Sequence, residues 1–302
     1  VLDQEAALAP AGEFVRSRFE TRDSASGKWL TMRLYQRILA AVYQKADPTG
    51  YLHYDLSRLR YAYENAVLPD KKERFETTLR ALYAQYRDHP AAGEILYRIH
   101  AEHVWSRDES EKGRLQNKAI VRELEDFVRR QPGTYGTSQC RTLLNRLQMK
   151  SLQVNTESVY LPDQPHLVSV EYRNVGRIYV RVVRGNFAPD FPDYISFEEK
   201  WDKLQKLPVV QERSWYIEDP GDCVEHRTEI NLDPLPLGHY WVLVSSAPDF
   251  DRSKSFNSYS EFTVSNLAVL NYTEHNAASF ITTDRRTGQP VSGVALHYFG
   301  QQ

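Results

Sequence analysis

Two histidines have the spacing that most resembles a metal pair. His100 and His103 flank Ala101 and Glu102 within a stretch of helical periodicity. Imidazoles three positions apart lie on the same side of a helix, where both could face one ion. The zinc-protease pattern His-Glu-x-x-His is absent, so we favour a solvated or partly packed helix face. Three other histidines stand isolated, without ligand partners in the sequence: His239, His275 and His297.

Acidic and hydroxyl residues offer a second kind of chemistry. Glu198-Glu199 and the pair Asp249 and Asp251 are of the type used in hydrolysis by paired carboxylates. Each pair falls on a short exposed helix or loop, where acids are usually solvated. The serines between positions 245 and 260 line a polar loop, with no Gly-x-Ser-x-Gly turn, and no glycine-rich phosphate loop occurs. We therefore predict no catalytic, cofactor-binding or metal-binding residue, and we expect the chain not to be an enzyme.

Aromatic residues could form a groove for a peptide or a glycan. The candidates are Trp201, Trp215, Trp241 and the loop 187–197. These side chains could equally close the ends of a β core, which is the interpretation we favour. The two cysteines, Cys140 and Cys223, fall in segments that we assign to different domains, so we predict no disulfide between them.

Charge and hydropathy exclude several classes of protein. The 302 residues carry a net charge of −2, with 41% hydrophobic and 26% charged residues. Residues 1–150 hold 25 basic and 20 acidic groups (+5), and residues 151–302 hold 13 and 20 (−7). No basic run interleaved with aromatics stands out, so we predict no nucleic-acid binding. No apolar run approaches the roughly 18 residues that would span a bilayer. The chain begins with Val1 and shows no signal pattern, which suggests a processed chain or an expressed fragment.

Residues 1–150 predict an all-α domain of helical hairpins. Apolar residues recur at three- and four-residue spacing between Pro- and Gly-containing breaks, after a lead-in with one short helix around Glu13–Phe19. The stretches 86–93 and 128–136 echo each other, because each has a helix end, a Pro, small residues and a new helix. This loosely resembles a tetratricopeptide-type repeat without its full signature. The apolar positions that mark the six main helices are Met32, Tyr35, Ile38, Leu39 and Val42; Leu56, Leu59, Tyr63 and Val67; Phe75, Leu79, Leu82 and Tyr86; Ile95, Leu96, Ile99 and His103; Ile120, Leu124, Phe127 and Val128; and Cys140, Leu143, Leu144 and Leu147.

Residues 151–265 predict an antiparallel β-sandwich of the macroglobulin-like or Ig-like kind. The stretch Pro165–Arg184 reads as two alternating strands closed by a tight turn at Arg173–Gly176, that is, a hairpin. A loop at Phe187–Pro192 and a short helix within Phe197–Leu207 interrupt the β rhythm. The other predicted strands are Leu152–Thr156, Val209–Ile217, Cys223–Leu232, His239–Ser245 and Tyr259–Val264.

Residues 266–302 predict the beginning of a second β-domain. Strands are expected at Leu267–Val269, Ser279–Thr283 and Val294–Phe299. Three strands are too few to close a sandwich, so either the chain is cut inside a domain or these strands pair with a neighbour. The predicted fold class is thus α+β multidomain, with domains at 1–150, 151–265 and 266–302.

Four motifs, in this order behind a helical segment, carry a family resemblance. They are Leu161–Pro165 leading into Glu171–Asn174, Leu235–Tyr240, Glu261–Ser265, and the Asp-x-x-Thr-Gly-x-Pro loop within Asp284–Val294. Together they resemble the N-terminal part of a bacterial α2-macroglobulin-like protein of the large kind found in Bacteroidetes. The resemblance covers residues 120–302 well and the earlier helices only loosely.

The resemblance implies a role without chemistry in these residues. Such proteins are similar to protease traps, in which a protease cuts a bait segment, stacked sandwiches rearrange and a Cys–Gln thioester acylates the attacker. The nearest match to the thioester motif is Cys223-Val224-Glu225-His226, where His226 cannot supply the Gln carbonyl. The motif also falls in a predicted strand of the first sandwich, whereas the family's thioester lies on a helical domain much further along.

The expected function is therefore a non-catalytic N-terminal scaffold of a protease inhibitor. The resemblance implies location in the periplasm or at the outer membrane of a Gram-negative bacterium, with membrane contact only through a lipid anchor outside this segment. The implied partners are downstream macroglobulin-like domains of the same full-length chain and, through the full-length protein, target proteases; no cofactor is expected. The alternative is a protein- or glycan-binding module that uses a concave helical face. An envelope glycan hydrolase would need acids in a cleft, and the sequence offers no convincing pair.

Overall fold

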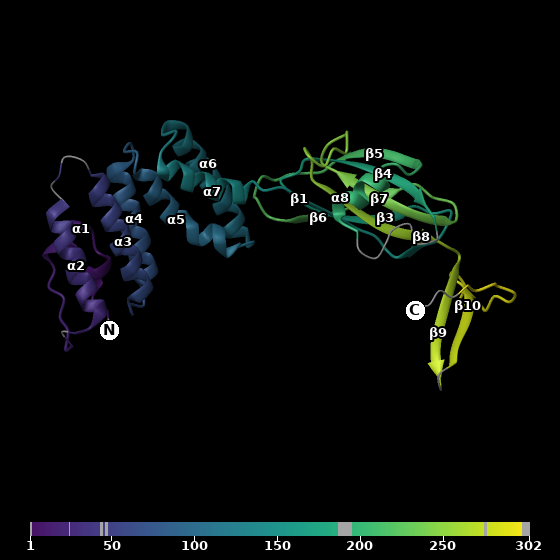
Figure 1. The fold of residues 1–302 in the computed structure, drawn as a ribbon, viewed down its shortest axis with the longest axis horizontal. Helices are drawn as coiled ribbons and strands as arrows, with labels where there is room; N and C mark the ends of the chain where they lie inside the picture. The colour runs from purple at the N-terminus through teal and green to yellow at the C-terminus, as the bar shows by residue number, and fades with distance from the viewer. Residues whose placement is uncertain are drawn as a thin grey trace. The chain divides into compact units, whose positions relative to one another are not determined.

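The chain folds into two compact units, Val1–Gln148 and Met149–Gln302 (Figure 1). A computed structural model describes residues 2–23, 25–42, 45, 48–186, 195–274 and 277–297. The first unit is helical, and the second is built of strands with one short helix. The chain is therefore a multidomain α+β protein. None of the helices in the described ranges combines the length and the apolar composition needed to span a bilayer.

The helical unit is an array in which each helix from α2 to α7 packs against the next one (Figure 1). Side-chain caps define where two of the helices begin. Ser110 Oγ accepts the N–H of Gly113 at 3.1 Å, and Thr134 Oγ1 accepts the N–H of Thr137 at 3.0 Å. The elements are the 3₁₀ turn η1 (Glu5–Leu8) and the helices α1 (Ala11–Arg16), α2 (Gly27–Val42), α3 (Thr49–Asn65), α4 (Lys71–Tyr86), α5 (Ala92–Ser106), α6 (Glu111–Arg130) and α7 (Tyr135–Leu147).

The helices α2 to α7 lie where apolar spacing predicts them, except that Val67 lies beyond α3, which ends at Asn65. The first short helix does not extend to Phe19. It ends at Arg16, because Ser17 turns to extended backbone (φ −70°, ψ 146°). Gln36 on α2 makes this ending possible, since its Nε2 donates to the carbonyls of Phe14 (2.8 Å) and Ser17 (2.7 Å). A residue 19 positions further on therefore decides the boundary, and local periodicity cannot reveal it.

Helices α5 and α7 approach most closely where two glycines meet. A Cβ added at Gly93 would lie 2.6 Å from the carbonyl carbon of Gly136, and one added at Gly136 would lie 2.7 Å from Gly93 Cα. Cys140 on α7 also donates its Sγ–H to the Gly93 carbonyl at 3.4 Å. The contact brings together the two stretches, 86–93 and 128–136, that echo each other in sequence.

The described residues of the second unit form three sheets. The strands are β1 (Ser151–Asn155), β2 (Val159–Tyr160), β3 (His166–Arg173), β4 (Arg177–Gly185), β5 (Val209–Tyr216), β6 (His226–Leu232), β7 (Gly238–Ser245), β8 (Asn257–Val264), β9 (Leu267–Glu274) and β10 (Ala277–Asp284), with the helix α8 (Phe197–Leu204) between β4 and β5. One sheet has the order β1-β3-β6, a second has the order β2-β8-β7-β4-β5, and β9 pairs with β10 alone. All pairings are antiparallel except the short parallel one between β2 and β8, which corrects the purely antiparallel prediction.

The predicted hairpin at Pro165–Arg184 is wrong. Strands β3 and β4 lie where expected, but β3 pairs with β1 and β6, whereas β4 pairs with β5 and β7. The turn instead carries the chain from one sheet to the other, with Asn174 at φ 55°. Alternation shows only that one face of each strand is buried, and it is the same whether two strands pair side by side or face each other across a core.

The three-stranded and five-stranded sheets enclose one hydrophobic core. Val168 and Val170 of β3 meet Val180, Val242 and Phe262 from the other sheet, and each is at most 1% exposed. A second cluster lies on the other face of the larger sheet, where α8 contributes Trp201 and Leu204. Strand β7 is buried almost throughout because both its faces are covered.

Further predictions differ from the structure or lie outside the described residues. The strand expected from Cys223 begins at His226 instead, after a bend in which Cys223 has φ 61°. No strand runs through 294–297, and the remainder of the strand expected up to Phe299 lies outside the described residues. The loop predicted at Phe187–Pro192, the part of the aromatic loop before 195, and His275 also lie outside them.

Candidate binding groove in the helical unit

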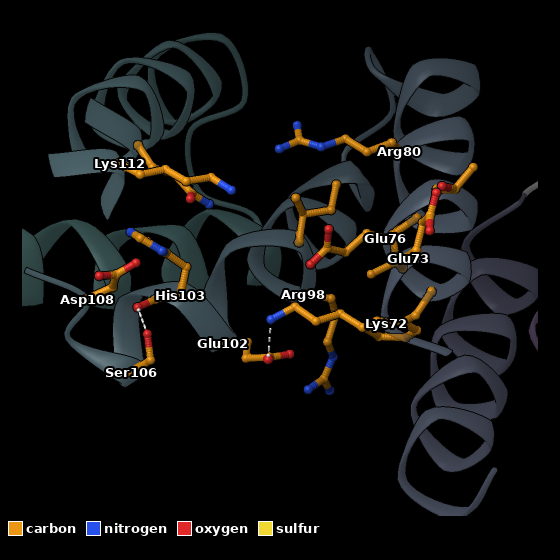
Figure 2. A pocket seen from close by; sticks show the side chains of 15 residues that line it. Lys72, Glu73, Glu76, Arg80, Arg98, Glu102, His103, Ser106, Asp108 and Lys112 are labelled. Carbon is orange, nitrogen blue, oxygen red and sulfur yellow. Dashed lines mark hydrogen bonds and ion pairs between the residues drawn. The ribbon is translucent and has the colours of Figure 1, made fainter. Parts of the chain in front are cut away.

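A groove of about 650 Å³ lies between α4, α5 and the beginning of α6. Its base is partly apolar, because Leu79 is buried and Phe75 and Ile99 are half-buried. Polar side chains surround this base (Figure 2). They are Lys72, Glu73, Glu76, Thr77 and Arg80 from α4; Arg98, Glu102, His103 and Ser106 from α5; Asp108; and Lys112 and Gln116 from α6.

One side of the groove is held by a bridge between α4 and α5. Lys72 Nζ lies 2.7 Å from Glu102 Oε1, and Tyr63 on α3 donates to Glu102 Oε2 at 3.0 Å. The Lys72 hydrogen bond is the main cause that lowers the pKa of Glu102. Tyr63 also stacks on Phe75, with ring centroids 4.5 Å apart. Three helices are thus fixed at this side.

A second bridge joins α4, α5 and α6. Arg80 Nη1 contacts both carboxylate oxygens of Glu123 at 3.2 and 3.3 Å, and His100 Nε2 lies 2.7 Å from Glu123 Oε2. Burial alone would raise the pKa of Glu123, but the hydrogen bond from His100 and the charge of Arg80 lower it. Glu123 therefore stays ionised and links α6 to Arg80 of α4 and His100 of α5.

The structure separates the two histidines that suggested a metal pair. His100 is 2% exposed and bonds to Glu123, whereas His103 Nε2 lies 2.9 Å from Asn117 Oδ1. The expected helix face is thus more buried at His100 than predicted, because α6 covers it. Within the described ranges no three His, Cys, Asp or Glu side chains are grouped as a metal site would require.

The groove is suited to binding a polar chain. Figure 2 shows Arg80 and Lys112 pointing into the space between α4 and α6, with Glu76 facing the same space. Ser106 is not aligned as a nucleophile, because its Oγ donates to the backbone carbonyl of His103 at 2.8 Å. The lining offers donors and acceptors of both signs over an apolar base, which fits an extended peptide or another polar polymer.

The acids that suggested hydrolysis lie apart from this groove. Glu199 is in the first turn of α8 and pairs with Lys203 at 3.0 Å. Asp251 accepts the N–H and Oγ–H of Ser253 within its own turn, and these bonds lower its pKa to about 2. Both acids act locally, as side-chain partners of neighbouring residues.

The Cys223–His226 stretch is organised around Asp222. Asp222 is 5% exposed, and its Oδ1 lies 2.8 Å from His226 Nε2 and 3.4 Å from the N–H of Val224. His226 is thus held by a carboxylate in the bend before β6. This geometry gives His226 a structural role.

The tryptophans are mainly core residues, as favoured. Trp201 on α8 is 0% exposed and Trp241 on β7 is 3% exposed, and both belong to the second cluster. Trp215 is partly buried and packs against the main core. Lys200 covers this second cluster, with Nζ 4.2 Å from the Trp241 ring centroid.

Sequence reasoning missed the groove, although a signal exists. Lys72, Glu76 and Arg80 follow one another at four-residue spacing, which places three charges along one face of α4. A row of charges usually marks a solvated face. Only the packing of α6 across α5 turns that face into the side of a groove.

Comparison with known proteins gives limited likeness. No family model matches the sequence, and no curated protein matches it. Among solved structures, native alpha-2-macroglobulin from Escherichia coli, spanning domains MG0-NIE-MG1, is similar with 18% identity and a TM-score of 0.31, over 46% of this chain and 46% of that one. The CARDB domain of the PF1109 protein from Pyrococcus furiosus, in complex with di-metal ions, is similar with 11% identity and a TM-score of 0.24, over 38% of this chain and 91% of that one. This chain thus spans less than half the length of the alpha-2-macroglobulin structure. At these TM-scores neither likeness assigns a function.

Proposed function

We propose that the chain is a non-catalytic N-terminal scaffold of an α2-macroglobulin-like protease inhibitor of the Bacteroidetes type, located in the periplasm or at the outer membrane. In this proposal α2–α7 form helical hairpins, β1–β8 a macroglobulin-like sandwich, and β9–β10 the beginning of a second such domain. The ordered motifs between Leu161 and Val294 support the assignment.

The observation that carries the proposal is the exposure of apolar side chains on the β9–β10 pair. Val269, Leu270 and Tyr272 are each at least 50% exposed, although they lie on paired strands. Two strands cannot bury both of their faces, and an isolated two-stranded sheet is at best marginally stable. Further polypeptide that covers this pair would be supplied by downstream macroglobulin-like domains of the full-length protein.

The proposed role is mechanical. The sandwich would pass the rearrangement that follows bait cleavage along the stack, and the target protease would meet only the full-length protein. No residue of this chain acts on a substrate in this proposal.

The test uses the natural full-length gene product. It is exposed to trypsin with and without methylamine, and native gels and denaturing gels are compared. We expect covalent trypsin adducts, or a shift on the native gel to a more compact form that retains trypsin. Cleavage without a covalent adduct, a mobility shift or retained trypsin would contradict the proposed protease trap.

A second function is favoured by the groove between α4, α5 and α6. Its mixed charges suit a module that binds a polypeptide or glycan and has no inhibitor role. Charge reversal at Glu76→Lys with Lys112→Glu should abolish binding of a purified partner identified by crosslinking, whereas Arg122→Glu, also on α6 but outside the groove, should not. Equal binding by both variants would exclude the groove as the binding site.

A further inference from the structure

His166 is a buried histidine without a polar partner. It begins β3 and is 0% exposed, and neither ring nitrogen has a hydrogen-bond partner in the described part of the chain. A buried polar group without a partner is destabilising, and a charged one much more so.

Tyr160 packs on the His166 ring from residues 156–165, a segment that we call the strap. The strap contains β2 and is tied to β8 by backbone hydrogen bonds from Thr263 N to Ser158 O (3.0 Å) and from Ser265 N to Tyr160 O (2.9 Å). The Tyr160 ring lies 4.8 Å from the His166 ring, and Tyr160 Oη donates to the Leu167 carbonyl at 2.5 Å. Moving the strap away would take the Tyr160 ring off the imidazole.

Among the described residues, no charged side chain bonds to His166 or shifts its pKa. Phe262 of β8 lies 6.0 Å away, and β6 places Leu232 opposite in register. The titratable residues of the strap are Glu157, Tyr160 and Asp163. Burial raises the pKa of Tyr160, so that it stays neutral, and Glu157 gives its N–H to Tyr160 Oη. Desolvation lowers the pKa of His166. The closed strap thus holds a neutral ring.

The strap also contacts the segment that leads into β9 and β10. Ser265, which bonds to Tyr160, lies two residues before β9, and Arg286 Nη2 donates to the Pro162 carbonyl at 3.3 Å. Release of the strap therefore removes contacts that hold the beginning of the β9–β10 pair.

We propose that His166 is an acid-responsive latch, in which uptake of a proton by the exposed ring keeps the strap away from β8 and frees the entry into β9. The proposal does not depend on the inhibitor function. It follows from a buried ring, a removable cover and the absence of a compensating charge among the contacts described.

Linkage between protonation of His166 and strap opening sets the direction and size of the pH effect. An exposed histidine titrates near pH 6.5, and the covered ring resists protonation to lower pH. Between these two values only the open form gains a proton, so the opening constant should rise about tenfold for each unit by which the pH falls below about 6.5. Above pH 7 it should be constant.

Amide hydrogen exchange of the complete 302-residue chain measures this constant. The N–H groups of Thr263 and Ser265 bond to the strap and report its opening, after correction for the intrinsic pH dependence of exchange. His166→Phe should abolish the pH dependence. Tyr160→Phe should raise opening at every pH and keep the slope, and His226→Gln should leave the slope unchanged.

Opening that is independent of pH between 7 and 5 in the natural chain would overturn the latch, as would a retained slope in His166→Phe. A direct NMR titration of the His166 ring in the natural sequence does not depend on a variant that folds. A ring that stays neutral well below pH 6.5 supports the proposal, and a ring that titrates at about 6.5 with no change in strap exchange contradicts it.

Discussion

Arg58 in the helical unit and His166 in the β unit are both fully buried, but the groups around them differ. In the helical unit Arg58 is fully buried, but it donates to the carbonyls of Ala7 and Ala9 at 2.9 Å each, forms an ion pair with Asp55, and lies 4.5 Å from the Phe14 ring centroid. In the β unit the equally buried His166 has neither a bond nor a counter-charge in the described residues.

The difference follows from the backbone groups that need a side chain as hydrogen-bond partner in each unit. The segment before α2 is mostly irregular, and its carbonyls need donors that only side chains of other helices can supply. Thr78 and Gln36 do the same for Leu8, Phe14 and Ser17. Strands satisfy their own backbone groups, so a buried polar side chain in the sheets is not needed for this purpose. This comparison suggests that polar burial in the first unit stabilises, while at His166 it makes the fold conditional on pH.

The largest expected contrast is between the two cysteines, one in each unit. Burial raises the pKa of the Cys140 thiol to about 12, so that about 10⁻⁴ of it is thiolate at pH 8. Cys223 is partly exposed. At pH 8 one thiol should react with a disulfide reagent in the native protein, and the second should react at least about a thousandfold more slowly until denaturant is added.

Cys140→Ala assigns these two phases, since it should remove only the slow one. Two fast thiols in the native protein would show that the α5–α7 contact opens freely. Absence of a fast thiol in Cys140→Ala would show that Cys223 is blocked or covalently engaged.

Removal of Arg58 should have the next largest effect. Arg58→Met leaves Asp55 buried without its counter-charge and two carbonyls unpaired, so we expect the free energy of unfolding to fall by about 3–5 kcal/mol. Urea titration followed by helical circular dichroism measures it. Arg60→Met, two residues along α3 in an exposed pair with Glu64, is the control and should change stability by less than about 1 kcal/mol. Equal effects would contradict the role of buried polar bonds in the first unit.

The glycine contact tests packing within the helical unit. Gly93→Ala and Gly136→Ala should each destabilise by about 1–3 kcal/mol, because the new methyl groups meet backbone that cannot move freely. Gly50→Ala on α3 meets nothing within 4 Å and should instead stabilise slightly, by up to about 1 kcal/mol. Thermal unfolding of the three variants distinguishes close packing from the general cost of altering a helix.

The smallest effect is expected at Glu123. Its folded-state pKa is lowered, so its contribution is present above the ordinary pKa of 4.5 and is lost as the pH falls through the lowered value. Glu123→Gln should destabilise by about 1–2 kcal/mol at pH 7, with little difference from the natural chain at pH 3. Denaturant titrations at both values measure this, and a difference that persists at pH 3 would assign the loss to packing instead of charge.

Sequence patterns located most of the elements. Three- and four-residue spacing placed α2 to α7, and alternation placed β3, β4, β7 and β8, because these patterns record which side of each element is buried. The patterns did not predict the partner of β3, the groove over α5 or the burial of His100. Each of these depends on which face meets which neighbour.

By itself the sequence determined the types of the elements, their order and the change from helices to strands near residue 150, since propensity, periodicity and breakers are local properties. Only the tertiary structure decided that Gly93 meets Gly136, that Arg58 bonds to Ala7, and that His166 lies without a partner beneath the strap. The first two of these contacts join residues 43 and 51 positions apart. A buried polar side chain stabilises or destabilises the fold according to the groups that the fold places around it.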